Sequence, residues 1–310
     1  MPPARKHTMN TKLRGSLFLL AAALIWGSAF VPQSMGMDYV GPYTFNTCRS
    51  LVGFLVLIPV VIFFRKDSLK KNPLSKEEIR ALNKRTVLAG VVCGLALSAA
   101  STFQQLGISL TTAGKTAFIT VLYIIIVPII SVFLGKNIPG LIWICAMISL
   151  TGFYLLCIKE GFTLSRGDFY CLVCAFCFSV QITCIDHFTK DGSPVDPVMM
   201  SMVQFFVVTV VSFFLTLLLE NPTLSSILDA KYSILYTGAL SSGVAYTCQI
   251  LGQKDSPPAI APLIMSLESV FAALFGWLIL NEKMSPRELL GCALVFIACL
   301  LSQLPHPGKE

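Results

Sequence analysis

The chain has 310 residues, of which 55% are hydrophobic and only 13% are charged, and its formal net charge is +7 at pH 7. Soluble domains carry about 25% charged residues, so this composition excludes an ordinary soluble protein and indicates a chain that lies mostly within a lipid bilayer. We expect the excess of Lys and Arg to mark the cytoplasmic side of a membrane, and we do not expect a nucleic acid partner.

Ten apolar stretches follow one another, each long enough for a transmembrane helix of about 17–25 residues. We expect them at 15–32, 42–64, 86–110, 114–135, 139–158, 167–187, 197–219, 232–254, 258–280 and 286–304. The polar segment 65–85 holds eight basic residues, and Ser75-Lys76-Glu77-Glu78 within it predicts a capping box that opens a short surface helix. An even number of spans puts both termini on one side, which the distribution of Lys and Arg predicts to be the cytoplasm.

The chain contains 11 cysteines, almost all of them inside apolar stretches, where cysteine behaves as a small hydrophobic residue. Cys171, Cys174 and Cys177 share one helical face, but no histidine lies close by in that stretch. A metal or redox site needs thiolates in contact with water. We therefore expect neither a metal site nor a cofactor.

Glu268 lies near the middle of the apolar stretch 258–280. A carboxylate at that depth costs a few kcal/mol unless it is protonated, paired or in contact with water, so such residues usually mark a functional site. The alternative is a neutral Glu268 that is hydrogen-bonded to a neighbouring helix. We expect the carboxyl group to face a cavity, since opening and closing of that cavity to water would then release and rebind a proton.

A shift of 145 residues aligns the third stretch with the eighth without a gap. Both contain T-x-Q-x-L-G, at 102–107 and 247–252, and the same shift places Tyr123 on Glu268. Five spans per half is an odd number, so the halves would cross the membrane in opposite directions. Inverted repeats of this kind build many secondary transporters, with the binding site between the halves.

Polar side chains follow helical faces on the repeat-related stretches. The stripes are Ser98, Ser101, Thr102, Gln105 and Ser109; Thr116, Thr120 and Tyr123; and Ser242, Tyr246, Gln249 and Gln253. Hydrogen bonds between helices could explain each residue singly, at about 0.6 kcal/mol. Whole stripes favour a water-filled cavity, and we predict that Trp26, Gln104, Tyr123, Tyr246, Gln249 and Glu268 line it.

Two basic residues allow two interpretations each. Lys115 opens the stretch 114–135, where it and the free N–H groups of the first helical turn could hold a carboxylate, so we include it among the predicted binding residues. Arg49 lies about two turns inside its stretch. For either residue, a long side chain that extends to the membrane interface is an equal alternative.

The order and spacing of several short motifs resemble the drug/metabolite transporter superfamily, specifically its EamA-type permeases. The motifs are Trp26-Gly27-Ser28-Ala29-Phe30, Arg49, Ala113-Gly114-Lys115 through Pro128, and Ser266-Leu267-Glu268 through Asn281-Glu282. The resemblance covers residues 15–303 and implies an all-α membrane protein with ten transmembrane helices in two inverted five-helix EamA repeats, at 15–158 and 167–304. Family members often have Pro after the Glu; Ser269 stands there instead, so we expect a smaller bend in this helix.

The resemblance implies export or import of amino acids, metabolites or drugs. We therefore predict a secondary transporter of a small organic solute in the cell membrane, with alternating access and with proton coupling through Glu268, as a monomer or homodimer. The alternative is a membrane-embedded enzyme that uses Glu268 as acid or base. The sequence contains no G-x-S-x-G, H-E-x-x-H or Walker A motif, which favours transport.

Overall fold

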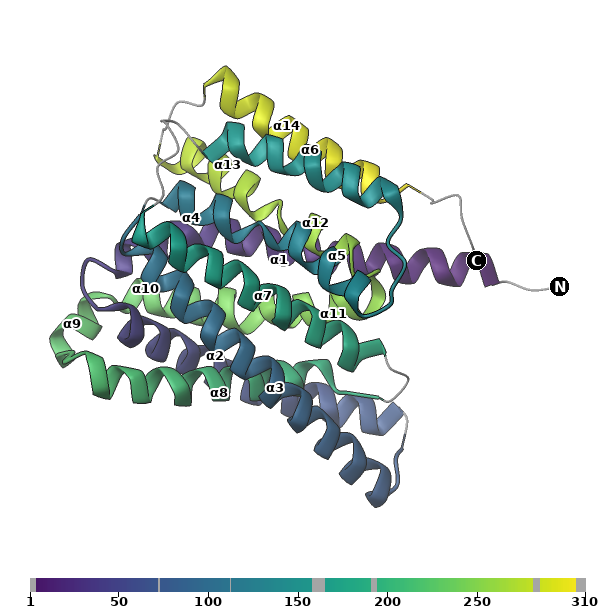
Figure 1. Cartoon of the computed structure of the whole chain (residues 1–310). Coiled ribbons are helices and arrows are strands. Elements are labelled where there is room, and N and C mark those ends of the chain that lie inside the picture. Colours follow the sequence, from purple (N-terminus) through teal and green to yellow (C-terminus); the bar gives the residue numbers. More distant parts are fainter. Residues whose placement is uncertain are drawn as a thin grey trace.

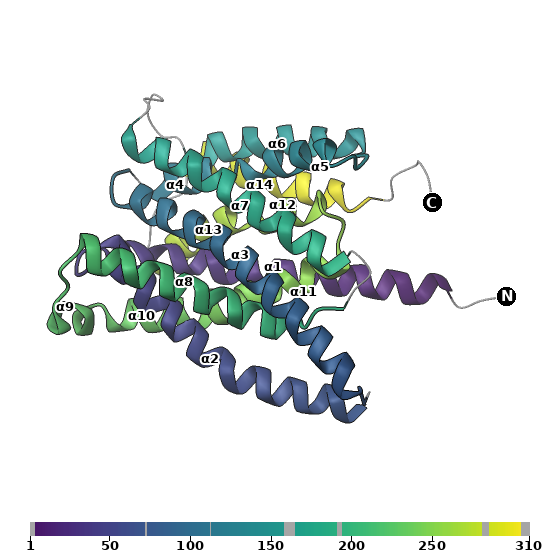
Figure 2. The same cartoon turned by 60° about the horizontal axis from the view of Figure 1, so that its bottom comes forward.

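A computed structural model describes residues 4–71, 73–111, 113–157, 165–190, 194–280 and 285–304. Every regular element within these ranges is a helix, and the helices run side by side in one bundle (Figures 1 and 2). The first half of the chain forms α1 (Ala4–Gly36), α2 (Pro42–Lys71), α3 (Lys76–Ile108), α4 (Ala113–Thr120), α5 (Tyr123–Phe133) and α6 (Gly140–Cys157).

The second half begins with the long helices α7 (Arg166–Lys190) and α8 (Pro197–Leu219) and continues through shorter ones. These are α9 (Leu224–Asp229), α10 (Lys231–Tyr236), the π-helix η1 (Thr237–Ala245), α11 (Tyr246–Asp255), α12 (Ile260–Met265), α13 (Glu268–Leu280) and α14 (Pro286–Ser302). In Figure 1, α1 begins and α14 ends at the same side of the molecule.

Six described stretches are long and apolar enough to cross a membrane: Thr11–Gly36, Pro42–Lys70, Lys76–Ile108, Thr116–Phe133, Arg166–Lys190 and Pro197–Leu219. They make the protein a multi-pass helical membrane protein. The other four predicted spans correspond to helices that are shorter or interrupted, such as Gly140–Leu156 and Ile260–Phe275. Ten membrane crossings therefore remain a prediction.

The segment between the second and third spans differs from the prediction. The Ser75 capping box is confirmed, with mutual hydrogen bonds between Ser75 and Glu78, but it opens the 33-residue helix α3 and no separate surface helix. At about 1.5 Å per residue, α3 is about 50 Å long, whereas the hydrocarbon core is about 30 Å thick. The end of α2 and the start of α3 extend beyond the rest of the bundle in Figure 2, and they carry most of the basic residues of 65–85.

Two predicted spans are interrupted near their middle. Residues 121–122 separate α4 from α5, and residues 266–267 separate α12 from α13. At both breaks, i→i−3 bonds replace the α-helical pattern, as in Leu122 N to Ile119 O and Leu267 N to Ile264 O. The break at 266–267 lies just before Ser269. The expectation that the helix bends less here than in family members with Pro stays a prediction.

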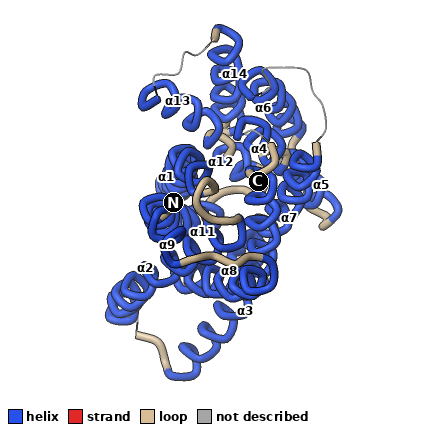
Figure 3. The backbone as a smooth tube through the Cα atoms, turned by 90° about the vertical axis from the view of Figure 1, so that its left-hand side faces the viewer, coloured by secondary structure: helices blue, strands red, loops and turns tan. Residues whose placement is uncertain are grey.

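The packing brings helices from both halves together. α6 packs along α14 at one edge of the bundle, and α2 and α3 lie at the opposite edge (Figure 3). Between these edges, α1 contacts α11 and α13, while α7 contacts α3, α4 and α5. The interrupted helices therefore lie in the interior, where large buried side chains such as Leu97, Ile124 and Ile182 surround them.

Candidate functional site

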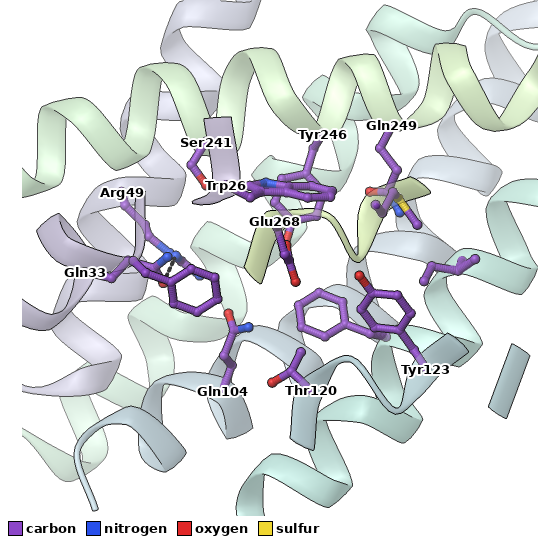
Figure 4. Close-up of a pocket in the computed structure, with 14 residues that line it drawn as sticks. Trp26, Gln33, Arg49, Gln104, Thr120, Tyr123, Ser241, Tyr246, Gln249 and Glu268 are labelled. Carbon is purple, nitrogen blue, oxygen red and sulfur yellow. Dashed lines mark hydrogen bonds between the residues drawn. The ribbon is translucent and has the colours of Figure 1, made fainter. Parts of the chain in front are cut away.

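A pocket lies in the interior between the two halves of the chain (Figure 4). Its cavity volume is ≈ 40 Å³, so the pocket is narrow in this conformation. Its walls combine aromatic rings, amides and two charged side chains. The lining residues are Trp26, Phe30, Gln33, Arg49, Gln104, Thr120, Tyr123, Phe178, Ile182, Ser241, Tyr246, Gln249, Met265 and Glu268.

Six of the seven residues predicted from the sequence as binding residues line this pocket: Trp26, Gln104, Tyr123, Tyr246, Gln249 and Glu268. They come from α1, α3, α5, α11 and α13. Lys115, the seventh, lies in the first turn of α4, and its side chain is outside the described part of the structure. Whether these residues bind a solute remains a prediction.

Glu268 and Tyr123 occupy equivalent places at the two helix breaks. Each is the first residue of the second half-helix, Glu268 of α13 and Tyr123 of α5. Their polar ends point into the same space in Figure 4, and the phenol interacts with the carboxyl group. Glu268 is only 6% exposed. The break thus places a buried carboxyl group at the first residue of a half-helix, in the interior of the bundle.

Aromatic rings form one wall of the pocket. The rings of Trp26 and Tyr246 meet edge to face with centroids 4.8 Å apart, and Phe205 packs on the other side of Tyr246 at 5.2 Å. Such pairs fix ring orientation and add about 0.5–1.5 kcal/mol beyond the buried area. Tyr246 follows η1 directly, and this π-helix also contributes Ser241 to the pocket. π-Helical segments are frequent at functional sites.

Three glutamine side chains form a row of hydrogen bonds next to the pocket. Gln249 Nε2 donates to Gln181 Oε1 at 3.2 Å, and Gln181 Nε2 donates to Gln204 Oε1 at 3.3 Å. Only Gln249 reaches the pocket itself. One N–H of its Nε2 is used in this bond, and its Oε1 has no hydrogen-bond partner in the described structure, so the second N–H and the oxygen are left for other contacts.

Arg49 is a pocket residue that our sequence analysis did not include in the site. It is 5% exposed, its Nη1 donates to Gln33 Oε1 at 2.8 Å, and its guanidinium lies 5.9 Å from the centre of the Phe45 ring. The alternative of a side chain that extends to the interface is therefore wrong. Its position two turns inside an apolar stretch was the available signal, but the partner Gln33 belongs to α1 and cannot be inferred from α2 alone.

The polar stripe that we predicted on the third span does not line the pocket. Ser98 Oγ donates to Gly94 O and Ser101 Oγ donates to Ser98 O, so both hydroxyls bond within their own helix. Gln105 Nε2 contacts Met37 Sδ at 3.2 Å. Only Gln104, on a neighbouring face of α3, reaches the pocket. On the eighth span Tyr246 and Gln249 line it, whereas Gln253 Nε2 donates to Ile182 O.

The described residues do not bring together three or more His, Cys, Asp or Glu side chains in an arrangement that could hold a metal ion. The described cysteines are free thiols, and Cys174 belongs to the buried apolar cluster. The chemistry of the pocket is therefore that of its carboxyl, guanidinium, amide and phenol groups.

A bundle of apolar helices with a central, partly polar pocket defines a multi-pass membrane protein of the transporter class. The model of the EamA-like transporter family matches the chain twice, over residues 13–158 and 165–304. The chain belongs to the EamA-like transporter family.

Relatives with known names agree with this assignment. An uncharacterized transporter of Archaeoglobus fulgidus is 29% identical over 303 residues, covering 94% of this chain and 87% of the relative. The uncharacterized transporter YoaV of Bacillus subtilis is 22% identical over 282 residues, covering 90% and 93%. The WAT1-related protein At3g02690, chloroplastic, of Arabidopsis thaliana is 22% identical over 304 residues, covering 93% and 69%.

One solved structure, described only as a crystal structure of a protein, has the same fold. It superposes with a TM-score of 0.73 at 17% sequence identity and covers 93% of this chain and 96% of its own.

Proposed function

We propose that this protein is a secondary transporter that moves a small organic solute across the cell membrane by alternating access, with proton coupling through Glu268. The observation that carries the proposal is the interior pocket, which gathers side chains from both halves of the chain around a buried carboxyl group. Transport through such a site needs the two halves to move relative to each other, so that the pocket opens to either side in turn.

We infer that the halves, 15–158 and 167–304, are inverted repeats. The helix breaks at 121–122 and 266–267 are related by the same 145-residue shift as the T-x-Q-x-L-G motifs. The packing is also related. In the first half, α3, α4 and α5 contact α7. Their counterparts in the second half, α11 and α13, contact α1. The two matches to the family model support the same division.

The two motif glycines provide a further parallel. A Cβ atom on Gly107 would lie 2.4 Å from Cys171 Sγ, and one on Gly252 would lie 2.6 Å from Leu19 Cγ. The backbones approach more closely at Gly252, where Gly15 O would lie 2.9 Å from that Cβ atom, than at Gly107, where Gly167 O would lie at 3.4 Å. We propose ten crossings with both termini in the cytoplasm, which labelling of each terminus from either side of the membrane would test.

The proposed coupling follows from the position of Glu268. In a closed, dry pocket the neutral carboxyl group is favoured, because burial destabilises the charged form. Opening of the pocket to water allows the proton to leave. A carboxyl group that is exposed to each side in turn can thus carry a proton across the membrane, with the phenol of Tyr123 as its neighbour on the opposite half.

Uptake by proteoliposomes, with and without an imposed proton gradient, tests the proposal. The Glu268→Gln variant keeps the shape and the neutral hydrogen bonding of the side chain but cannot titrate. It should fold, lose gradient-driven accumulation of solute and retain exchange of solute across the membrane. Accumulation that is equally proton-driven in wild type and variant would contradict the coupling role.

The alternative to this proposal is an enzyme that uses Glu268 as acid or base. The family and the named relatives are transporters, and no further observation favours an enzyme. Recovery of the chemically unchanged solute from the vesicle lumen distinguishes transport from conversion. The partners under this proposal are the solute, protons and the lipid bilayer, with a monomer or homodimer as the unit.

A further inference from the structure

The end of α2 and the start of α3 leave the bundle sideways. In Figure 3, which looks along the helices, both lie outside the outline of the other helices. In Figure 1, the start of α3 reaches about as far along the bundle as the end of α7, although α3 has 33 residues and α7 has 25. The extra length of α3 is therefore used beside the bundle. In a membrane, the headgroups of one leaflet occupy the space beside a bundle at the level of its helix ends.

The surface of α2 changes from apolar to basic at this level. Ile62, Phe63 and Phe64 are each more than half exposed, and in a membrane exposed apolar side chains of a spanning helix face acyl chains. Lys66 and Lys70 follow within the next two turns and are also exposed. So short a change from apolar to basic marks the boundary between acyl chains and headgroups.

A second row of basic side chains lies on the first turns of α3. Lys76, Arg80 and Lys84 are four residues apart, so they follow one face of the helix, and all three are exposed. We call Lys66, Lys70, Lys76, Arg80 and Lys84 the basic extension. Within the described part of the chain, none of the five belongs to an ion pair. Their charges are therefore left for a partner outside the protein.

The base of the extension is fixed to the bundle by two other arginines. Arg65 Nη2 donates to Asn83 Oδ1 at 2.6 Å, which joins α2 to α3, and Arg65 Nη1 lies 3.5 Å from Met199 Sδ. The guanidinium of Arg85 lies 5.9 Å from the centre of the Phe188 ring. These contacts hold the two helix ends together, so the five basic side chains form one surface.

The charge of this surface is positive. Residues 65–85 include eight basic and three acidic residues. Of the acids, Glu78 accepts a hydrogen bond from Ser75 N in the capping box, while Glu77 is exposed. Exposed apolar side chains border the charged ones on α2, so the surface fits a partner that has an anionic head and an apolar tail.

We propose that the basic extension binds the headgroups of anionic phospholipids in the leaflet on the side of the N-terminus. Lysine and arginine donate charge-assisted hydrogen bonds to phosphate oxygens. Each basic side chain near an anionic membrane surface raises the affinity about five-fold. The acyl chains of the same lipids lie against Phe63 and Phe64. This site is separate from the pocket and does not depend on the proposed function.

Lipid binding to the purified full chain in detergent tests the proposal. The protein is titrated with phosphatidylglycerol or with phosphatidylcholine of the same acyl chains, and the lipid-bound protein is measured by native mass spectrometry. We expect the first phosphatidylglycerol to bind about ten-fold or more tightly than the first phosphatidylcholine. The ratio should fall as the ammonium acetate concentration is raised, because salt screens exposed charges.

Two matched double variants locate the site. Arg80→Gln with Lys84→Gln removes two charges of the extension and should lower the ratio about five-fold or more. Lys231→Gln with Arg287→Gln removes two charges from exposed residues at the opposite end of the bundle and should leave the ratio unchanged. All four residues are helical, and glutamine is a good helix former, so both variants should fold.

The same measurement distinguishes a lipid from a simple anion. Inorganic phosphate at the concentration of the lipid should not displace phosphatidylglycerol, because it lacks the acyl chains. Displacement by phosphate would identify a site for any small anion and overturn the proposal. Equal affinity for the two lipids in the wild type, an unchanged ratio in the Arg80 and Lys84 variant, or an equal loss in both variants would overturn it as well.

Discussion

Two buried layers of side chains lie one helical turn apart. They differ in whether their charged residues form ion pairs within the protein. In the pocket layer, Ile182 of α7 and Gln249 of α11 lie with Arg49 and Glu268, which form no ion pair with each other. Four residues further along the same helices are Asp186 and Gln253. There, Asp186 binds Lys136 Nζ at 2.5 Å and also pairs with Lys190, so its charge is fully compensated.

We call Lys136, Asp186, Lys190, Gln253 and Ser256 the ion-pair layer. It joins three segments that are distant in sequence, because Lys136 follows α5, Asp186 and Lys190 end α7, and Ser256 lies between α11 and α12. Lys190 Nζ also donates to the carbonyl oxygen of Ser256, and Gln253 Nε2 donates to Ile182 O at 3.0 Å. These bonds hold the helix ends together next to the pocket.

The difference indicates what each buried charge is for. A charge that is compensated within the protein stabilises one arrangement of the helices, whereas a charge that is left without a counter-ion is available to a ligand. Under alternating access, the ion-pair layer would have to separate when the pocket opens toward this end. Its removal should therefore change stability, and removal of the pocket charges should change binding and transport.

The largest expected effect on stability is that of Asp186→Asn. The side chain of Asp186 is 2% exposed, and the substitution leaves two lysines without their partner. Breaking a buried pair costs about 3–5 kcal/mol, and we expect about 3 kcal/mol here because the lysine side chains, 39% and 29% exposed, can reach water. Thermal unfolding in detergent measures the loss.

Glu268→Gln is the matched control, since it also replaces a buried acid by its amide but breaks no ion pair. It should change the free energy of unfolding by less than about 1 kcal/mol. Equal destabilisation by Asp186→Asn and Glu268→Gln would remove the distinction between the two layers.

A smaller effect is expected for Gln253→Leu. The substitution keeps the volume close to that of glutamine and removes the bond from Gln253 Nε2 to Ile182 O. The Ile182 carbonyl is an α-helical acceptor as well, so the loss should be about 1 kcal/mol. Denaturation of wild type and variant side by side tests this value, and a loss as large as that of Asp186→Asn would mean that the amide, not the ion pair, dominates the layer.

The smallest effect is expected at the exposed edge of this end of the molecule. Arg14 donates two hydrogen bonds to Asp255 Oδ2, at 2.9 and 2.7 Å, but the Arg14 side chain is 61% exposed. Arg14→Gln should therefore cost less than about 1 kcal/mol, and the cost should shrink as salt is added. A salt-independent loss would show that this pair belongs to the ion-pair layer.

Composition and spacing were sufficient to predict the membrane bundle and six of the fourteen residues that line the pocket. The 145-residue shift placed Tyr123 opposite Glu268, and both prove to begin half-helices at equivalent breaks. Such a shift can be detected in the sequence because the same residue types recur in the same order, as in the two T-x-Q-x-L-G motifs.

Features that depend on contacts between helices could not be predicted. The hydrogen bond of Arg49 with Gln33 joins α2 to α1, and the ion pair of Asp186 with Lys136 joins α7 to the segment after α5. Asp186 lies near the end of an apolar stretch, where a solvated acid is the usual interpretation. The stripe of Ser98 and Ser101 was misleading, because a hydroxyl can be satisfied by its own helix and need not face water.

Under the proposed repeat, the π-helix η1 corresponds to a part of α3 that is regular α-helix. Gly94 of α3 packs against Gln204 and Val207 of α8 as Gly238 packs against Arg49 and Val52 of α2, and a pairing of these two glycines gives a shift of 144. For Gly107 and Gly252 the shift is 145, one residue more.

With that pairing, the second half has one residue more between Gly238 and Gly252 than the first half has between Gly94 and Gly107, and a π-helical turn accommodates one extra residue within a helix. The wider turn changes the rotation of the residues before it, such as Ser241, relative to Tyr246 and Gln249. The two proposed repeats therefore present different side chains to the pocket.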